Sequence, residues 1–235
     1  MIKLELVKRT DPRYQEMRDR HYIPNRGTHG QQCHYLIWDD NSLVGIVSGA
    51  AAVYGVAERD RFFGLPRGLE KEVMLNGIVH NVVFRIEQTR SNLATQVLAK
   101  WRRLIAHDWH ALYGVRVAGF ETLVIPEVRD STMSDRLGTL YLADNWTACG
   151  QTAGNTKAHG KGGLTTAHAR RKTDRKLLFC FRCKNVDFPT TYVSTWNSNN
   201  PEAKAIRKMR QEVKLKLLRR GPVMVRRLPG KAEII

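Results

Sequence analysis

Several features are scarce in this 235-residue sequence, and each absence narrows the class of protein. It has only four cysteines, Cys33, Cys149, Cys180 and Cys183, which suits a reducing compartment where thiols stay free. No apolar run reaches the roughly 20 residues that a membrane-spanning helix needs. Residues 1–5 lack the apolar core of a secretory signal peptide. These absences predict a soluble protein of the cytoplasm.

Acidic residues are also scarce in the last third of the chain. Residues 155–235 hold 20 Lys and Arg against 5 Asp and Glu, whereas residues 1–154 hold 19 against 17, so the last third carries most of the net charge of +17. Positive charge segregated in this way attracts polyanions and steers them to one face. It predicts contact with nucleic acid, although a basic tail that only aids solubility has the same composition. An acidic membrane surface is disfavoured, because no basic amphipathic stretch carries exposed Trp or Phe.

What the sequence does contain is an alternation of strand and helix patterns. Strands are expected at 3–8, 33–38, 43–50, 72–86 (as one strand, or two with a bend at 76–77), 115–125 and 177–182, and the apolar turn at 146–150 is expected to lead into another strand. Helices are expected at 12–20, 92–113, 139–145 and 202–220, with a short helix or crossover at 53–63 and a basic loop at 152–176. The Gly and Ala content of 43–50 indicates that another element packs closely over that strand. The order predicts an α/β domain with mixed strand pairing over residues 1–185, followed by a basic C-terminal helical extension over 186–235.

The best-defined element is the amphipathic helix at 92–113. Ser91 and Asn92 can cap its start, Gly114 can end it, and apolar residues recur between them at three- and four-residue spacing. Free backbone N–H groups at a helix start bind phosphate or carbonyl oxygens. The candidate donor-binding turn is therefore Arg90, Ser91, Asn92, Leu93 and Ala94. The alternative is an ordinary capped helix with a solvated Arg90.

Glu121 is the first candidate for a catalytic residue. It interrupts an apolar run, between Phe120 and Leu123. A carboxylate in such a run is costly to bury unless it is paired or functional. We expect a general base or a metal ligand here, and the alternative is a salt bridge to an arginine on a neighbouring strand such as Arg85.

The residues that carry a family resemblance are spread over about 15–185. They are His21-Tyr22, Asn92–Ala94, His107–Trp109, Tyr113-Gly114, Glu121-Thr122, Gly138–Tyr141, Asn145-Trp146 and 150–154. In its middle the chain resembles the fold of the GCN5-related N-acetyltransferase superfamily. More closely, it resembles two relatives of that superfamily, the Mom DNA-modification proteins of bacteriophage and the DruA proteins of anti-phage systems. The superfamily's Gly-x-Gly/Ala turn is missing before the helix at 92–113, so the expected donor is either acyl-CoA-like or an aminoacyl-tRNA.

The Mom resemblance implies transfer of a small carbamoylmethyl or glycinamide-type group to adenine N6 in DNA, which protects phage DNA from restriction. It suggests Tyr141 as general acid or orienting hydroxyl, and His21, Tyr22 and Glu121 as a catalytic set that could also hold iron. The alternatives are a core role for Tyr141, and a packed Tyr22 beside an exposed His21. Two rival functions stay open. One is a non-catalytic DNA-binding component of an anti-phage system, and the other is an acyltransferase for a small-molecule or protein amine.

An adenine in duplex DNA must leave the base stack before its N6 can be modified. The aromatic residues that could stack a flipped base are Tyr22, Trp38, Tyr54 and Trp146. Phosphates are expected to contact the basic residues Lys157, Lys161, Arg170, Arg171, Lys172, Arg175, Lys176, Arg207, Lys208, Arg210 and Lys214. The expected partners are duplex DNA and, for an aminoacyl donor, tRNA. The sequence is compatible with a homodimer but does not indicate one.

Overall fold

The computed structural model describes residues 1–23, 30–66, 68–88, 90–127, 137–152, 155–157, 170–172 and 175–188. In chain order the first elements are β1 (Ile2–Val7), α1 (Pro12–Asp19), β2 (Gln32–Asp39), β3 (Ser42–Ala51), α2 (Ala57–Phe63), α3 (Leu69–Leu75) and β4 (Ile78–Ile86). They are followed by α4 (Leu93–Tyr113), β5 (Gly119–Val124), α5 (Thr139–Ala143), β6 (Thr147–Gln151), β7 (Asn155–Lys157), β8 (Arg170–Lys172) and β9 (Leu177–Arg182). In these ranges, no helix is both long and apolar enough to cross a membrane.

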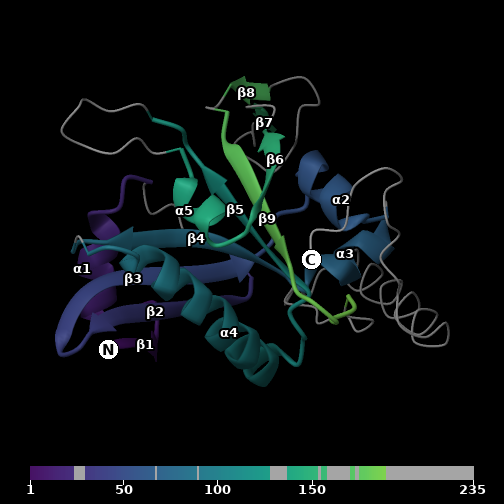
Figure 1. Ribbon diagram of the computed structural model, residues 1–235. Helices are drawn as coiled ribbons and strands as arrows, with labels where there is room; N and C mark the ends of the chain where they lie inside the picture. Colours follow the sequence, from purple (N-terminus) through teal and green to yellow (C-terminus); the bar gives the residue numbers. More distant parts are fainter. Residues whose placement is uncertain are drawn as a thin grey trace.

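The described strands form a central seven-stranded sheet in the order β1-β2-β3-β4-β5-β9-β6, and a separate pair, β7-β8. Within the central sheet β4 and β5 are parallel neighbours, and the other neighbours pair antiparallel. Helix α4 lies across one face of the sheet, and α1 lies on the opposite face (Figure 1). The chain is therefore a mixed α/β protein whose sheet is flanked by helices, as the sequence predicts.

Helix α4 packs on the sheet through one apolar stripe. Leu93, Val97, Trp101, Ile105 and Trp109 are all buried and belong to the main core. Their four-residue spacing places them along one side of the helix, as expected. On strand β3 below them, a Cβ added to Gly49 would lie 2.4 Å from Ile105 Cδ1 and 3.2 Å from Trp101. The absence of a side chain at Gly49 thus lets α4 approach β3 closely, and close packing over this strand is what its Gly and Ala content predicted.

Most of the expected elements are present, and three details differ. The run 72–86 is not all strand: α3 occupies Leu69–Leu75, with Glu70 and Glu72 in its first turn, where acidic side chains stabilise a helix. Asn92 has a left-handed backbone (φ 58°) and its side chain makes no capping hydrogen bond to α4. The run 152–176 is not simply a loop, since β7 and β8 pair antiparallel within it. The helix expected at 202–220 lies outside the described residues.

A buried polar cluster connects α1 to the sheet. His34 Nδ1 lies 3.1 Å from Tyr14 Oη and 3.0 Å from Ser48 Oγ, and those two oxygens are 2.8 Å apart. The Nδ1 atom can accept a hydrogen bond from these hydroxyls only while the imidazole is neutral. Burial, together with repulsion from Arg9 and Arg18, lowers the pKa of His34 to about 4. The cluster therefore stabilises the fold only when His34 carries no charge.

We expect the stability of the protein to fall as the pH is lowered from 6.5 to about 4, because of His34. The ordinary pKa of histidine, 6.5, lies above the folded value of about 4, so the unfolded chain binds more protons between these values. The contribution of His34 is complete above pH 6.5 and is lost as the pH approaches 4. Urea unfolding measures how much the free energy of unfolding decreases from pH 7.0 to pH 4.5. This decrease should be about 2 kcal/mol smaller in His34→Gln than in the wild type. Equal losses in the two proteins would refute this role.

We also expect Gly49 to tolerate no large side chain. Gly49→Val places branched carbons against Ile105 and Val79, and overpacking of this kind costs about 1–3 kcal/mol. Gly55 is a matched control, because a Cβ there meets no atom within 4 Å, and Gly55→Val should change stability by less than about 0.5 kcal/mol. The measurement is urea unfolding of both variants. Similar stabilities for the two would contradict the close packing of α4 on β3.

Candidate active site

The candidate site lies in the middle of the sheet, where the pairing of β4 with β5 ends. Parallel pairing runs from Ile78 opposite Gly119 to Asn81 opposite Thr122 and goes no further. On the other side of β4, Gly49 pairs with Asn81 but Ser48 pairs with Val83, so one residue of β4 is left without a partner. This is a β-bulge, which bends a strand and commonly lies beside a functional site. The two strands therefore stop pairing just where β4 bends.

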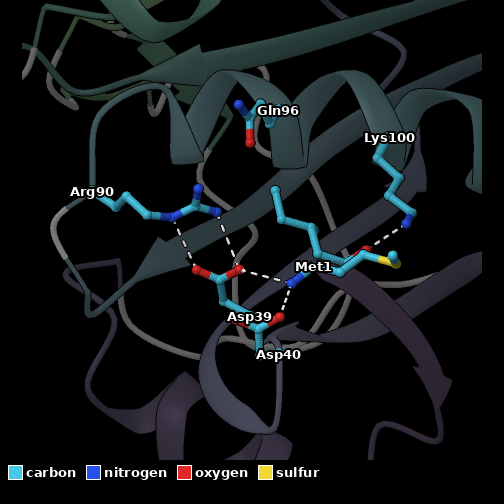
Figure 2. A pocket seen from close by; sticks show the side chains of 7 residues that line it. Met1, Asp39, Asp40, Arg90, Gln96 and Lys100 are labelled. Carbon is cyan, nitrogen blue, oxygen red and sulfur yellow. Dashed lines mark hydrogen bonds and ion pairs between the residues drawn. The ribbon is translucent and has the colours of Figure 1, made fainter.

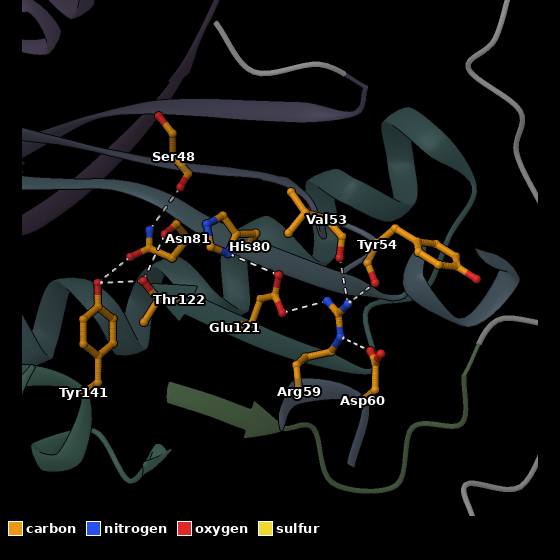
Figure 3. Close-up of polar contacts among 10 residues, drawn as sticks. All are labelled: Ser48, Val53, Tyr54, Arg59, Asp60, His80, Asn81, Glu121, Thr122 and Tyr141. Atoms are coloured by element: carbon orange, nitrogen blue, oxygen red, sulfur yellow. Dashed lines mark hydrogen bonds and ion pairs between the residues drawn. The ribbon is translucent and has the colours of Figure 1, made fainter. Parts of the chain in front are cut away.

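Side chains replace the missing backbone pairing at this point, as Figure 3 shows. Asn81 Nδ2 donates to the carbonyl oxygens of Ser48 (3.0 Å) and Val83 (3.1 Å). Tyr141 Oη, from α5, donates to Asn81 Oδ1 at 2.8 Å. Thr122 Oγ1 donates to the Asn81 carbonyl at 3.1 Å and lies 3.4 Å from Tyr141 Oη. A tyrosine hydroxyl is thereby fixed where β4 and β5 separate.

Tyr141 fits both roles that the sequence left open. It is buried in the main core, and its ring stacks on Phe179 with centroids 5.5 Å apart. Burial raises the pKa of Tyr141 above its ordinary value, so the hydroxyl keeps its proton near neutral pH. Such a hydroxyl acts as a hydrogen-bond donor rather than as a base.

A buried charged group lies on the opposite face of the sheet. It includes the residues that precede Asn81 in β4 and Thr122 in β5, which are His80 and Glu121. Glu121 Oε2 accepts from Arg59 Nη1 at 2.8 Å, and His80 Nδ1 lies 3.3 Å from Glu121 Oε1 outside hydrogen-bond geometry. The side chains of Glu121 and Arg59 have no exposed surface, whereas 12% of the His80 side chain is exposed. Of the three, His80 is therefore the residue that a substrate could contact.

The charge on Glu121 is maintained by its neighbours. Burial alone would raise the pKa of the carboxyl group, but the contact with His80 and the positive charge of Arg59 outweigh it, so the pKa of Glu121 is lowered. Glu121 is thus ionised at neutral pH. Because the Glu121 side chain has no exposed surface, it is not placed to contact a substrate directly, as the expected general base would.

The salt bridge to Glu121 comes from a different arginine than the one expected. Arg85 pairs with Glu87 at 2.8 Å, while Arg59 reaches Glu121 from helix α2. Arg59 lies four residues before Phe63, and both side chains are fully buried, so they share the face of α2 that packs on the sheet. That spacing from an aromatic residue is the signal that sequence reasoning missed in this charged segment. His80 was missed because it lies within a mostly apolar strand.

The donor-binding turn is occupied by contacts within the protein. Both Nε and Nη2 of Arg90 bind the carboxylate of Asp39, at 3.0 and 3.1 Å (Figure 2). Asp39 also lies 3.7 Å from the N-terminal amine of Met1. A cavity of about 420 Å³ adjoins them, lined by Met1, Ile2, Asp39, Asp40, Arg90, Gln96 and Lys100. Arg90 is therefore ion-paired while its side chain stays 43% exposed, and a phosphate bound to these two nitrogens would have to displace Asp39.

The rest of this turn is exposed at its start and packed against the core at its end. Ser91 and Asn92 are exposed, whereas Leu93 is 1% exposed and packs in the main core. The Leu93 N–H donates to the Arg90 carbonyl at 3.1 Å, and Ala94 is half-buried within the first turn of the helix.

The proposed metal ligands do not form a site. The rings of His21 and Tyr22 are 4.6 Å apart, and His21 Nδ1 already accepts a hydrogen bond from the Ile23 N–H at 3.1 Å. Glu121 is in contact with Arg59 and His80. In the part of the chain that the structure describes, no three His, Cys, Asp or Glu side chains are grouped so that they could hold a metal ion. These residues do not fit iron, and no step is assigned to it.

The four candidate aromatic residues separate clearly by exposure. Trp146 is buried and donates to Asp144 at 2.9 Å, and Trp38 donates to Glu5 at 2.8 Å. Tyr22 is 41% exposed and Tyr54 is 51% exposed. The sequence left open the alternative of a packed Tyr22 beside an exposed His21. The structure shows the reverse, because Tyr22 is exposed and His21 is buried (8% exposed).

The expected phosphate contacts are described only in part. Lys157 pairs with Arg170 across the β7–β8 hairpin, which also contains Arg171 and Lys172. Arg175 is exposed and Lys176 is half-buried. The other five expected residues, Lys161, Arg207, Lys208, Arg210 and Lys214, lie outside the described ranges. The hairpin thus gathers four basic residues in two short paired strands.

Comparison with known proteins agrees with the class of protein that this fold defines, a mixed α/β protein with one parallel strand pair at the centre of its sheet. The family model described as Druantia protein DruA matches residues 1–179, and the chain belongs to this family. The DruA part of the sequence resemblance is therefore confirmed. No curated protein matches the sequence.

The fold is similar to those of several solved acetyltransferases. One is a Bacillus subtilis acetyltransferase in complex with CoA, at 9% identity, covering 78% of this chain and 99% of that chain with a TM-score of 0.44. A Bacillus cereus IAA acetyltransferase is 8% identical, with 78% and 100% covered and a TM-score of 0.39. A Staphylococcus aureus N-acetyltransferase is 9% identical, with 77% and 98% covered and a TM-score of 0.40.

We expect Arg59 to be required mainly because Glu121 is buried. Arg59→Met leaves the carboxylate in the core without its cation and should destabilise the fold by about 3–5 kcal/mol. The double variant Arg59→Met/Glu121→Met removes both charges and should be more stable than the single variant. Urea unfolding measures both, with Arg85→Met as a control expected to cost less than about 1 kcal/mol. A double variant no more stable than Arg59→Met would contradict the pairing.

Proposed function

We propose that this DruA-family chain is a transferase that moves a small acyl or aminoacyl-derived group to an amine of DNA, with adenine N6 as the acceptor. The observation that carries the proposal is the arrangement at the end of the β4–β5 pairing. There, His80 and the ionised Glu121 lie on one face of the sheet, and the Tyr141 hydroxyl lies on the other. A histidine oriented by a buried carboxylate is a common general base.

The reaction follows from these positions. His80 Nδ1 lies 3.3 Å from Glu121 Oε1, and a small rotation of the ring would turn its N–H toward that oxygen. Neutral His80 then has a free lone pair on Nε2, and this atom takes a proton from the attacking amine. A bond forms between the amine nitrogen and the donor carbonyl carbon, and the bond from that carbon to the leaving sulfur or oxygen breaks. The imidazolium returns its proton to the leaving atom. Glu121 stabilises the imidazolium, and Tyr141, once released from Asn81, donates a hydrogen bond to the leaving atom.

The acceptor class is supported by charge and by family. The excess of Lys and Arg in residues 155–235 would attract a polyanion. The match to the DruA family, which the sequence resemblance links to anti-phage defence, is consistent with an acceptor in DNA. On the Mom resemblance, the final group on N6 is of the carbamoylmethyl type, which is joined through a methylene carbon, so the aminoacyl amide formed by attack on the donor carbonyl would have to rearrange to reach it. The modification would protect the DNA that carries it from restriction. The donor is an activated ester, either an acyl-CoA-like thioester or an aminoacyl-tRNA.

One observation favours a second function. Arg59, Glu121, Asn81 and Tyr141 are all buried and bonded to one another or to the backbone, as in a closed structural core. A non-catalytic DNA-binding component of the defence system would be built in this way. The two functions differ in whether DNA leaves the protein chemically changed.

Mass spectrometry of nucleosides from the DNA of cells expressing the full chain tests the proposal. We expect a modified deoxyadenosine that falls by at least about 100-fold in His80→Ala, since loss of a general base costs 10²–10⁴. His107→Ala is the matched control, because the His107 side chain is 79% exposed on α4, and it should leave the modification unchanged. Unmodified DNA that is bound in a salt-sensitive way would establish the non-catalytic function instead. Acylation of free amines alone would indicate a small-molecule or protein acceptor.

A further inference from the structure

The segment between β3 and α2 exposes two large apolar side chains beside the buried charges. Val53 is 52% exposed and Tyr54 is 51% exposed. Their backbone is nevertheless fixed, because Arg59 Nη2 donates to the carbonyl oxygens of Val53 at 2.7 Å and Tyr54 at 3.2 Å. The Tyr54 ring extends away from Arg59, as Figure 3 shows. An exposed aromatic ring is therefore carried on an anchored backbone.

The ring of Tyr54 is also supported from one side by a cation. Lys71 Nζ lies 4.2 Å from the ring centroid, at the distance of a cation–π contact. Lys71 itself is only 7% exposed and is held by an ion pair with Asp60. Asp60 in turn accepts from Arg59 Nε at 2.7 Å. A continuous set of ionic contacts thus runs from the ring to the arginine that binds Glu121.

These contacts define the class of ligand that suits Tyr54. A fixed aromatic ring with an exposed surface binds planar groups by stacking, and nucleobases of any sequence stack on such rings. Trp38 and Trp146 are engaged inside the fold, and the Tyr22 ring packs against His21. Among the four candidate aromatic residues, Tyr54 is the one that combines the greatest exposure with support by a cation. The basic last third of the chain would bring a nucleic acid strand to it.

We propose that Tyr54 is a stacking platform for an unpaired base of the DNA strand whose neighbouring adenine reaches His80. One guanidinium group, that of Arg59, bonds both the Tyr54 carbonyl and the Glu121 carboxylate, so the platform and the His80–Glu121 pair are joined through a single side chain. The position of the neighbouring adenine rests on the proposed function. The stacking of a base on Tyr54 does not, and it is measured without any reaction.

The test uses the full chain and a short single-stranded DNA that contains 2-aminopurine, whose fluorescence is quenched on stacking. The wild type should quench it, and anisotropy should give the Kd. Tyr54→Ala should abolish the quenching and raise the Kd at least about fivefold, the effect of losing one stacked base. Tyr54→Phe retains the ring and should bind within about twofold of the wild type. Leu112→Ala, at a 55% exposed residue of α4, is a matched control that should have no effect.

Three results would overturn the platform: no quenching by the wild type, unchanged quenching and Kd in Tyr54→Ala, or equal losses in Tyr54→Ala and Tyr54→Phe. Circular dichroism and urea unfolding establish that Tyr54→Ala is folded, as expected for an exposed side chain. Quenching that depends on Tyr54, in a wild type that leaves DNA unmodified, supports the platform and refutes the transferase. If adenine is modified and Tyr54→Ala changes neither the quenching nor the Kd, the transferase is supported and the platform is refuted.

Discussion

The buried ion pair between Arg59 and Glu121 is the interaction on which the rest of the candidate site depends. Each charge removed from water costs several kcal/mol, and only close pairing with further hydrogen bonds offsets this cost. Arg59 meets that condition because its nitrogens bind Glu121, Asp60 and two backbone carbonyls. The same bonds hold helix α2 on β5 and fix the segment that carries Tyr54. The positive charge of Arg59 also helps to keep Glu121 ionised, with Oε1 of the carboxylate 3.3 Å from His80 Nδ1.

The second constraint is the bulge in β4, which places chemistry on both faces of the sheet. Because successive residues of a strand point to opposite faces, His80 and Asn81 present different groups on the two sides of one position. Asn81 replaces the lost backbone pairing and holds Tyr141, while His80 contacts Glu121. On the proposed function, the donor and the acceptor would approach from the two faces and meet beyond the last paired residues of β4 and β5, between His80 and Tyr141.

Local patterns predicted the elements well but not the pairs of charges between them. Helix α4 was predictable because 21 residues of 3.6-residue periodicity end at Gly114, and Glu121 because an unpaired buried carboxylate is costly. Helix α3 was not predictable, since the short apolar run Val73–Leu75 fits a strand as well as a helix. Arg59 lies 62 residues before Glu121, and Asp39 lies 51 residues before the Arg90 that it binds. Only the fold brings such partners together, and the hairpin β7–β8 depends in the same way on pairing across 12 intervening residues.

Charge is distributed unequally between the two parts of the chain. In residues 1–154 acidic and basic residues nearly balance, and Arg59, Arg90 and Arg102 are each paired with a carboxylate. Long-range attraction to a nucleic acid therefore has to come from residues 155–235, where basic residues outnumber acidic ones by four to one. Attraction of this kind does not depend on base sequence or on whether a base is flipped. On the proposed function, discrimination of an unpaired adenine would then reside in the α/β body, where Tyr54 would offer a stacking surface and His80 a proton acceptor.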